Sequence, residues 1–281
     1  MVQIASVFAL AALTAVQATP NSANMIQVFG GKEAEIGKHL YVTGRREDET
    51  DQNYCGGAVI SPTAILTTSY CIEDDNINYV SIGSHYLSGA KDGERIAVKK
   101  IVQHPKFNDD TMVYDFVVLE LANATTVTPI EILFDENDPV VAPGAVATAR
   151  GWGTTSVLGP HSDVLKEVDL KIWSNKDCQA AFDNLHNPSL TPVDVTMICA
   201  GGVKGEGTCD DDEGGPLTVS KDGKEMLVGL TSWNVACAPP DRASIYSRSR
   251  RPRTLLRRAL PSRHARRWHS AAPIGAGLYG L

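Results

Sequence analysis

The stretch Cys209-Asp210-Asp211-Asp212-Glu213-Gly214-Gly215-Pro216-Leu217 is the key to interpreting this chain. Its second half predicts a tight backbone turn that runs into a strand, because glycine accepts a positive φ freely and proline fixes its own φ at a strand edge. Its first half places four acidic residues in a row between a cysteine and that turn. The stretch therefore combines a demanding backbone conformation with a concentrated negative charge.

Charge is unevenly distributed along the 281 residues. Residues 1–241 hold 16 Lys and Arg against 33 Asp and Glu, whereas the residues from Arg242 onward hold ten arginines and no acid. An acidic body argues against nucleic-acid binding, which requires a basic face on the folded part. The length allows one or two domains, and we expect one, because all-β barrels commonly use about 200 residues or more as a single unit.

The N-terminus predicts secretion. Residues 1–18 are apolar and end in small residues at a plausible cleavage point after Ala18, which is the pattern of a signal peptide, with a buried N-terminal helix as the alternative. The stretch is too short for a membrane span, and no later stretch is long and apolar enough for one. We therefore expect no membrane association.

Six cysteines form an even set, which in a secreted chain suggests disulfides, although six cysteines permit 15 pairings. No pair has the short spacing of a zinc site, so no metal is expected. The motif Asn123-Ala124-Thr125 is an N-glycosylation acceptor that fits the same compartment. The cysteines are Cys55, Cys71, Cys178, Cys199, Cys209 and Cys237.

Most of the body predicts short strands between turns, which favours an all-β barrel or sandwich over alternating strands and helices. One helix is expected, with Ser174 as its cap and Cys178, Ala181, Phe182 and Leu185 on one face. The predicted strands, rich in β-branched or alternating residues, are 79–82, 96–102, 116–121, 146–149, 168–173 and 226–230.

Residues 28–247 resemble the chymotrypsin/trypsin-like serine proteases. The motifs that carry the resemblance are Val28-Phe29-Gly30-Gly31 at the mature terminus, Cys55-Gly56-Gly57-Ala58-Val59-Ile60-Ser61, Gly151-Trp152-Gly153-Thr154, the 209–217 stretch and Thr231-Ser232-Trp233. The resemblance implies an all-β fold of two six-stranded antiparallel β-barrels, with little helix and a cleft between the barrels. It also implies the disulfides Cys55–Cys71, Cys178–Cys199 and Cys209–Cys237.

The same resemblance indicates lost catalysis. Tyr70 stands where the family has its base His, and a phenol with a pKa near 10 cannot take a proton from a hydroxyl at neutral pH. Glu213 stands at the nucleophilic Ser, and Asp211 at the Gly that presents an oxyanion-hole amide, so both add negative charge beside that hole. Asp115, at the position of the acid that orients the base, has lost its partner. Because nucleophile and base act as a unit, we expect no catalytic residue.

Positions that support specificity and activation also differ from the family. Gly207 stands where trypsin-like pockets have an acid, and Asn234 and Ser244 replace two pocket glycines. Residues 19–27 contain no Lys or Arg, so the basic activation site ahead of Val28 is missing. Asp212 then has either no ammonium partner or one made by an unusual cleavage, and the alternative is that it is a solvated or hydrogen-bonded loop acid.

The acidic residues allow two other site chemistries. Asp115 and Glu213 could form the carboxylate pair of a glycosidase, but Tyr70 stands between them in a barrel pair built for peptides. Residues 210–213 could bind Ca²⁺, but calcium loops space their ligands at alternate positions around a Gly turn. A solvated acidic rim is the preferred interpretation, and no cofactor is expected.

The residues 248–281 have no counterpart in the family. Their arginine-rich composition is typical of a disordered basic arm and equally of a shifted reading frame. Binding of a polyanion by this segment is a further alternative.

Among protease homologues, the chain is most similar to the secreted glucanase inhibitor proteins of oomycete plant pathogens. That resemblance implies an inactive, monomeric binding protein in the host apoplast, with a plant endo-β-1,3-glucanase as its partner, that limits the release of defence-eliciting glucan fragments. The alternative is a secreted trypsin-like endopeptidase with residual or atypical activity.

Overall fold

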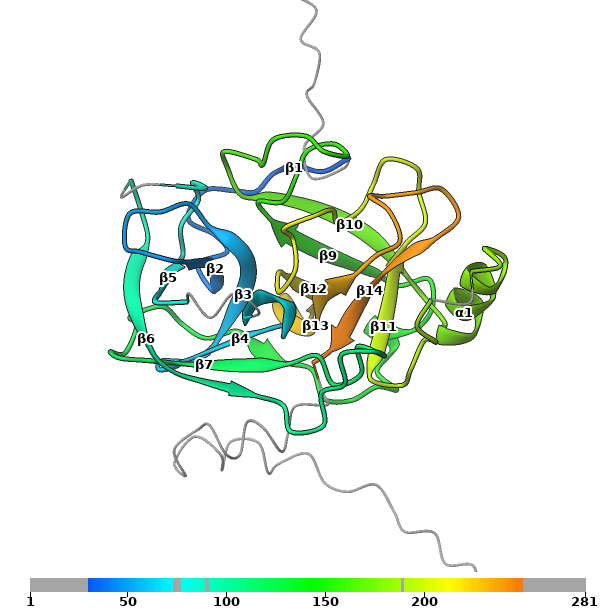
Figure 1. Cartoon of the computed structure of the whole chain (residues 1–281), viewed down its shortest axis with the longest axis horizontal. Coiled ribbons are helices and arrows are strands. Elements are labelled where there is room, and N and C mark those ends of the chain that lie inside the picture. The colour runs from blue at the N-terminus through cyan, green and yellow to red at the C-terminus, as the bar shows by residue number, and fades with distance from the viewer. Residues whose placement is uncertain (1–29, 73–76, 89–90, 188–189, 250–281) are drawn as a thin grey trace, which may run out of the picture.

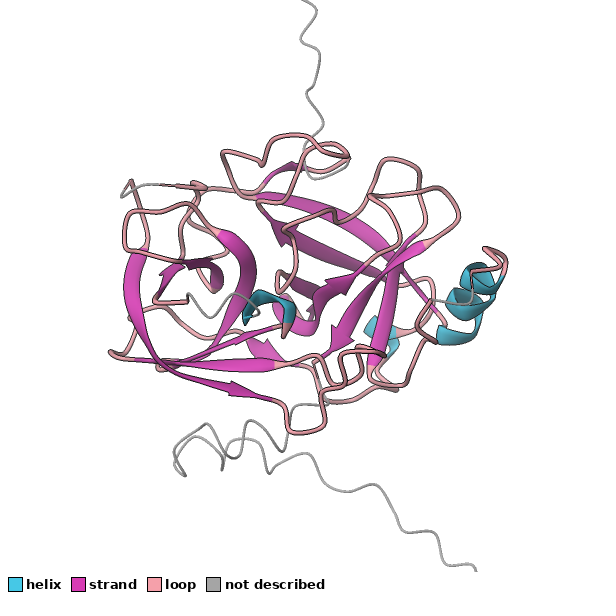
Figure 2. Ribbon diagram, viewed as in Figure 1, coloured by secondary structure: helices cyan, strands magenta, loops and turns pink. Residues whose placement is uncertain are grey.

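The computed structural model describes residues 30–72, 77–88, 91–187 and 190–249. Two β-barrels lie side by side, with the N-terminal barrel at the left in Figure 1 and the C-terminal barrel at the right. Strands dominate the described residues, and one α-helix lies at the outer edge of the second barrel (Figure 2). The expected all-β fold of two six-stranded barrels is confirmed.

The first barrel closes in the order β2-β3-β4-β7-β6-β5, and every pairing in it is antiparallel. Predicted strand 79–82 is β5, while predicted strand 116–121 begins one residue later, at Val117. The strands are β2 (Val42–Arg46), β3 (Tyr54–Ser61), β4 (Ala64–Thr67), β5 (Tyr79–Ile82), β6 (Glu94–Gln103) and β7 (Val117–Leu121).

The second barrel closes in the order β9-β10-β11-β14-β13-β12, because β9 pairs with both β10 and β12. Two short strands are added at its sides: β1 (Lys32–Glu33) pairs antiparallel with β10, and β8 (Glu131–Ile132) pairs parallel with β13. The barrel strands are β9 (Val146–Gly151), β10 (Lys166–Trp173), β11 (Met197–Gly201), β12 (Pro216–Lys221), β13 (Lys224–Trp233) and β14 (Ala243–Arg248).

Each barrel is filled by the inward-facing residues of its own strands. The core of the first barrel also includes Trp152, Leu227 and Leu230 from the second half of the chain, so the two barrels share a continuous apolar contact. Burial of this apolar surface is the main force that holds the barrels together. The core of the second barrel is built around residues such as Ala149, Leu170, Ile198, Leu217 and Tyr246.

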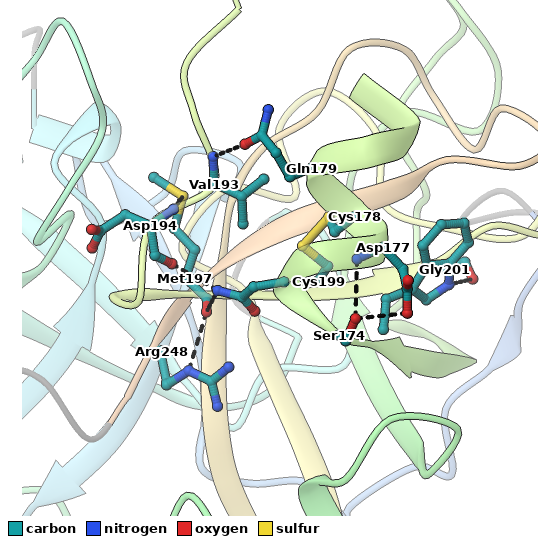
Figure 3. The surroundings of a disulfide bond; sticks show 12 residues. Ser174, Asp177, Cys178, Gln179, Val193, Asp194, Met197, Cys199, Gly201 and Arg248 are labelled. Carbon is teal, nitrogen blue, oxygen red and sulfur yellow. Dashed lines mark hydrogen bonds between the residues drawn. A yellow bond between two sulfur atoms is a disulfide. The ribbon is translucent and has the colours of Figure 1, made fainter. Parts of the chain in front are cut away.

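The predicted helix is α1 (Asn175–Asp183), and Ser174 is its N-cap. The Ser174 side chain accepts a hydrogen bond from the Asp177 N–H at 3.0 Å, which satisfies one of the free donors of the first turn. Cys178 and Phe182, two of the residues predicted to share one face, are buried, whereas Leu185 lies beyond the end of the helix. The disulfide Cys178–Cys199 attaches α1 to β11 (Figure 3).

Two 3₁₀ turns, Tyr70–Ile72 and Pro139–Val141, complete the described elements. Within the described residues, every helix falls short of the length and apolar character that a bilayer crossing demands. The predicted signal peptide (1–18), the segment 19–27 and almost all of the Arg-rich segment 248–281 lie outside the described residues.

Candidate functional site

The loop of residues 209–215 lies where the two barrels meet. Gly56 of β3 donates its N–H to the Glu213 carbonyl at 2.6 Å, and Gly214 donates to the Thr231 carbonyl of β13 at 2.8 Å. Gly214 has a φ of +76°, and a Cβ on it would overlap the Gly56 carbonyl and the Thr67 hydroxyl. The glycines of the stretch are therefore required by close packing between the barrels, and β12 begins at Pro216 as predicted.

Asp211 adopts a φ of +69°, the left-handed conformation that glycine adopts without strain. Aspartate is one of the few other residues that tolerate this region, because its short polar side chain can bond locally. Its Oδ2 accepts a hydrogen bond from His161 Nε2 at 2.7 Å. The loop thus adopts here a backbone conformation typical of glycine while it presents an acidic side chain.

Asp212 is fully buried and serves the backbone. Its Oδ1 accepts from Gly153 N–H at 2.9 Å and its Oδ2 from Cys209 N–H at 3.0 Å. Burial raises the pKa of Asp212 to about 6, although these two hydrogen bonds oppose the rise. A Cβ on Gly151 or Gly153 would collide with its carboxylate, which explains the glycines of the Gly-Trp-Gly turn. Val28, whose amine would be its partner after cleavage, lies outside the described residues.

Glu213 folds its carboxyl group back onto the loop. The backbone N–H groups of Glu213 itself and of Asp211 lie beside this carboxyl group and act to lower its pKa, while its Oε2 is sealed from solvent without a hydrogen-bond partner among the described residues. Burial, reinforced by the charges of Asp212 and Asp211, raises the pKa of Glu213 to about 8. In serine proteases the N–H groups at these two positions form the oxyanion hole. Here the Glu213 carboxyl group lies beside these donors.

Asp115 is completely buried and hydrogen-bonded. Its Oδ1 accepts from Ser69 N–H at 2.6 Å, and its Oδ2 accepts from the Ser232 hydroxyl at 2.5 Å. Tyr70 follows Ser69 in a 3₁₀ turn, and its side chain is 48% exposed. Asp115 therefore holds the backbone of the segment that carries Tyr70, and no imidazole stands at this position to act as a base.

The positions of the predicted specificity pocket are tightly packed. Gly207 is buried, and a Cβ on it would lie 3.1 Å from the Ala238 Cβ. Ser244 is also buried, and Asn234 is half-buried. None of these three positions therefore offers a carboxylate to a basic substrate side chain.

Two features of the surroundings were not predicted from the sequence. The first is the hairpin 154–161, which Thr154 and His161 attach to the acidic loop. The second is a buried ionic cluster around Arg150, which bonds Glu225 at 2.7 Å and Glu167 at 3.0 Å, with His39 at 2.9 Å from Glu225. In both features the acidic residues lie more than ten positions in sequence from their partners, so no local motif indicates these contacts.

The structure joins the cysteines as Cys55–Cys71, Cys178–Cys199 and Cys209–Cys237, the pairing that the resemblance implies. The last of these bridges anchors the acidic loop at Cys209. Asn123, the predicted glycosylation acceptor, is exposed.

Comparison with known proteins agrees with this architecture. The trypsin family model matches residues 28–254. Glucanase inhibitor protein 1 of Phytophthora infestans is 36% identical over 79% of this chain and 83% of its own length, and glucanase inhibitor protein 3 of the same organism is 37% identical over 84% and 90%. A trypsin of Simulium vittatum is 32% identical over 86% and 98%. The chain belongs to the trypsin family.

Proposed function

We propose that this protein is a secreted, catalytically inactive trypsin homologue that binds a plant endo-β-1,3-glucanase in the apoplast and inhibits it. The observation that carries the inactive half of the proposal is the carboxyl group of Glu213, which stands at the nucleophile position in place of a hydroxyl and lies beside the N–H donors of the oxyanion hole. A tetrahedral intermediate would need those donors and a hydroxyl that is absent. Tyr70 in place of the base supports the same conclusion.

The inhibitor half is supported by the similarity to proteins named glucanase inhibitors over most of the chain. Identity alone does not separate inhibitor from enzyme, because a trypsin is 32% identical over a similar length. The distinction rests on the site residues. A rigid pair of barrels lets the surrounding loops be adapted to a partner without disturbing the core. Secretion directed by residues 1–18 and a monomeric state are parts of the proposal.

Inactivity is tested with the purified protein and peptide substrates that carry basic, aromatic or small residues at the cleavage point. We expect no turnover above background and no reaction with serine-directed phosphonates. Turnover that disappears in Glu213→Ala would instead establish the alternative, an endopeptidase of atypical mechanism. Incubation with a soluble β-1,3-glucan, followed by a reducing-end assay, tests the carboxylate-pair alternative at the same time.

Inhibition is tested by titrating the protein into a fixed concentration of plant endo-β-1,3-glucanase. We expect loss of glucanase activity at a stoichiometric ratio and a non-covalent complex in which neither chain is cleaved. Because the body is acidic, association should slow as ionic strength rises. A glucanase that keeps full activity at a large excess of the protein, together with capture of a different partner from infected plant fluid, would refute the assignment.

A further inference from the structure

The hairpin 154–161 has an unusual tip. Thr155 donates its N–H to the Pro160 carbonyl at 3.0 Å, and Gly159 donates to the Ser156 carbonyl at 2.8 Å. These bonds close a β-turn whose two central residues are Val157 and Leu158. Both side chains point into solvent: Val157 is 62% exposed and Leu158 is 93% exposed.

Leu158 has a φ of +58°, in the left-handed region. Turn positions of this kind are normally filled by Gly, Asn or Asp, because a branched apolar side chain is disfavoured there. An exposed leucine is common on its own and requires no explanation. An exposed leucine in a disfavoured backbone conformation, beside an exposed valine, does not contribute to the stability of this chain. The combination points to a role outside it.

The base of the hairpin is hydrogen-bonded to the loop of residues 209–215, which carries Asp211 and Glu213. Thr154 donates its N–H to the Asp210 carbonyl at 2.9 Å, and its hydroxyl lies 2.9 Å from Cys209 Sγ. His161 Nε2 donates to Asp211 Oδ2 at 2.7 Å. Asp211, which stands where the family has a glycine, therefore also provides the hydrogen bond that holds the hairpin. The tip is mounted on a rigid base, which reduces the entropy lost when a partner binds.

Charge around the hairpin is of one sign. The segments 151–165 and 205–220 contain no Lys or Arg, whereas four of their acids are at least partly exposed: Asp163, Glu206, Asp210 and Asp211. Asp212 and the carboxyl group of Glu213 are buried and are not counted as surface charge. A partner that covers this surface must place basic side chains against it, since facing like charges would oppose association. An anionic membrane or a nucleic acid is repelled for the same reason.

From these observations we infer that the hairpin tip, Val157 and Leu158, is the apolar anchor of the inhibitory interface, and that it inserts into a small apolar pocket rimmed by basic side chains on the partner protein. This rests on the proposed function and specifies which surface of the chain carries it. Buried apolar anchors surrounded by a polar rim provide most of the affinity of protein interfaces, and the acidic rim contributes mainly to the rate of association. Asp211 and His161 are positioning residues for the anchor.

The test compares inhibition of the glucanase by the wild-type protein and by three variants. Leu158→Asn removes the anchor while it favours the same left-handed turn, so the melting temperature should be unchanged or higher. We expect its inhibition constant to rise about tenfold or more, mainly through faster dissociation. Val157→Thr should weaken inhibition several-fold. Val146→Thr is the matched control, because Val146 is 55% exposed at the far end of β9, and it should leave inhibition unchanged.

The outcomes separate the two proposals. If the wild-type protein inhibits the glucanase and Leu158→Asn inhibits equally well, the anchor inference is wrong and the proposed function stands. If the wild-type protein does not inhibit, the proposed function fails and the anchor falls with it. An equal loss in Val157→Thr and Val146→Thr would also overturn the inference, because it would show an effect that is not specific to the hairpin. So would a concentration-dependent dimer that Leu158→Asn abolishes, since the tip would then bind a second copy.

Discussion

The buried carboxyl group of Glu213 predicts that stability falls as pH rises. Its pKa is raised from 4.5 to about 8 in the folded protein. The folded state therefore binds this proton more tightly than the unfolded state does. Its contribution is most favourable below about pH 4.5 and is lost as the pH rises toward about 8. The pKa of Asp212 is raised to about 6, so this residue adds a further loss of stability with rising pH, over a lower pH range.

The magnitude follows from the size of the pKa change. A rise from 4.5 to about 8, at about 1.4 kcal/mol per pKa unit, corresponds to about 5 kcal/mol of unfolding free energy. Some of this loss is recovered, because the side chain is half-buried and a local opening of the loop hydrates the ionised carboxylate. We therefore expect that ionisation of Glu213 costs about 2 to 3 kcal/mol, a large share of the stability of a typical domain.

Glu213→Gln isolates this effect, because the amide copies the shape of the protonated acid and cannot ionise. Urea unfolding with the disulfides intact, followed by tryptophan fluorescence, should give similar stabilities for the variant and the wild type at about pH 5. At about pH 9 the variant should be about 2 to 3 kcal/mol more stable. Asp212 is unchanged in both proteins, so its contribution cancels. Glu206→Gln makes the same substitution in the same segment and should show no such pH dependence.

A difference between Glu213→Gln and the wild type that is the same at both pH values would refute the reasoning. It would show that the carboxyl group is either hydrated or already ionised in the folded protein, and that it is not held beside the oxyanion-hole donors as a neutral acid.

Three further changes test the buried polar framework by urea unfolding. Asp115→Ala should cost about 2 to 3 kcal/mol, because it leaves the Ser69 N–H buried without an acceptor, and an unchanged midpoint would mean that water replaces the carboxylate. Arg150→Ala should cost about 3 to 5 kcal/mol, because it leaves the Glu225 carboxylate without its cationic partner, whereas a cost below about 1 kcal/mol would show that His39 alone is sufficient. Ser174→Ala should cost about 1 kcal/mol through loss of the helix cap, and Ser174→Asn should retain most of the stability.

Much of the fold was predictable because most strands alternate or are β-branched. Predicted strand 168–173 lies within β10, and 226–230 lies within β13. Strand β2 was missed, because its sequence Val-Thr-Gly-Arg-Arg contains a glycine and two charged residues. Arg46 is nevertheless buried there, with its Nε donating to Asn53 Oδ1 at 2.9 Å. A tertiary partner thus makes a charged residue compatible with the interior of a barrel, and local patterns do not report such partners.

The candidate site, like the fold, could be predicted only in part. The positions of Tyr70, Asp115, Asp211 and Glu213 could be assigned from motif spacing, because the family frame is continuous around each of them. The orientation of the Glu213 carboxyl toward its own backbone could not, since it depends on how β3, β13 and the loop pack together. Side-chain direction is a property of the packed structure.

The kept acids Asp115 and Asp212 differ from the substituted Tyr70 in a physical respect that explains why the remains of the triad are poor evidence for catalysis. Asp115 and Asp212 are fully buried, and each accepts hydrogen bonds from backbone N–H groups of neighbouring segments. Loss of either would leave buried donors unsatisfied, so folding alone is sufficient to require them. Tyr70, by contrast, is half-exposed and can differ from the family at little cost to folding. A trypsin homologue that no longer cleaves peptides would therefore keep its buried acids for structural reasons, while its exposed loops and the hairpin 154–161 remain free to acquire a partner.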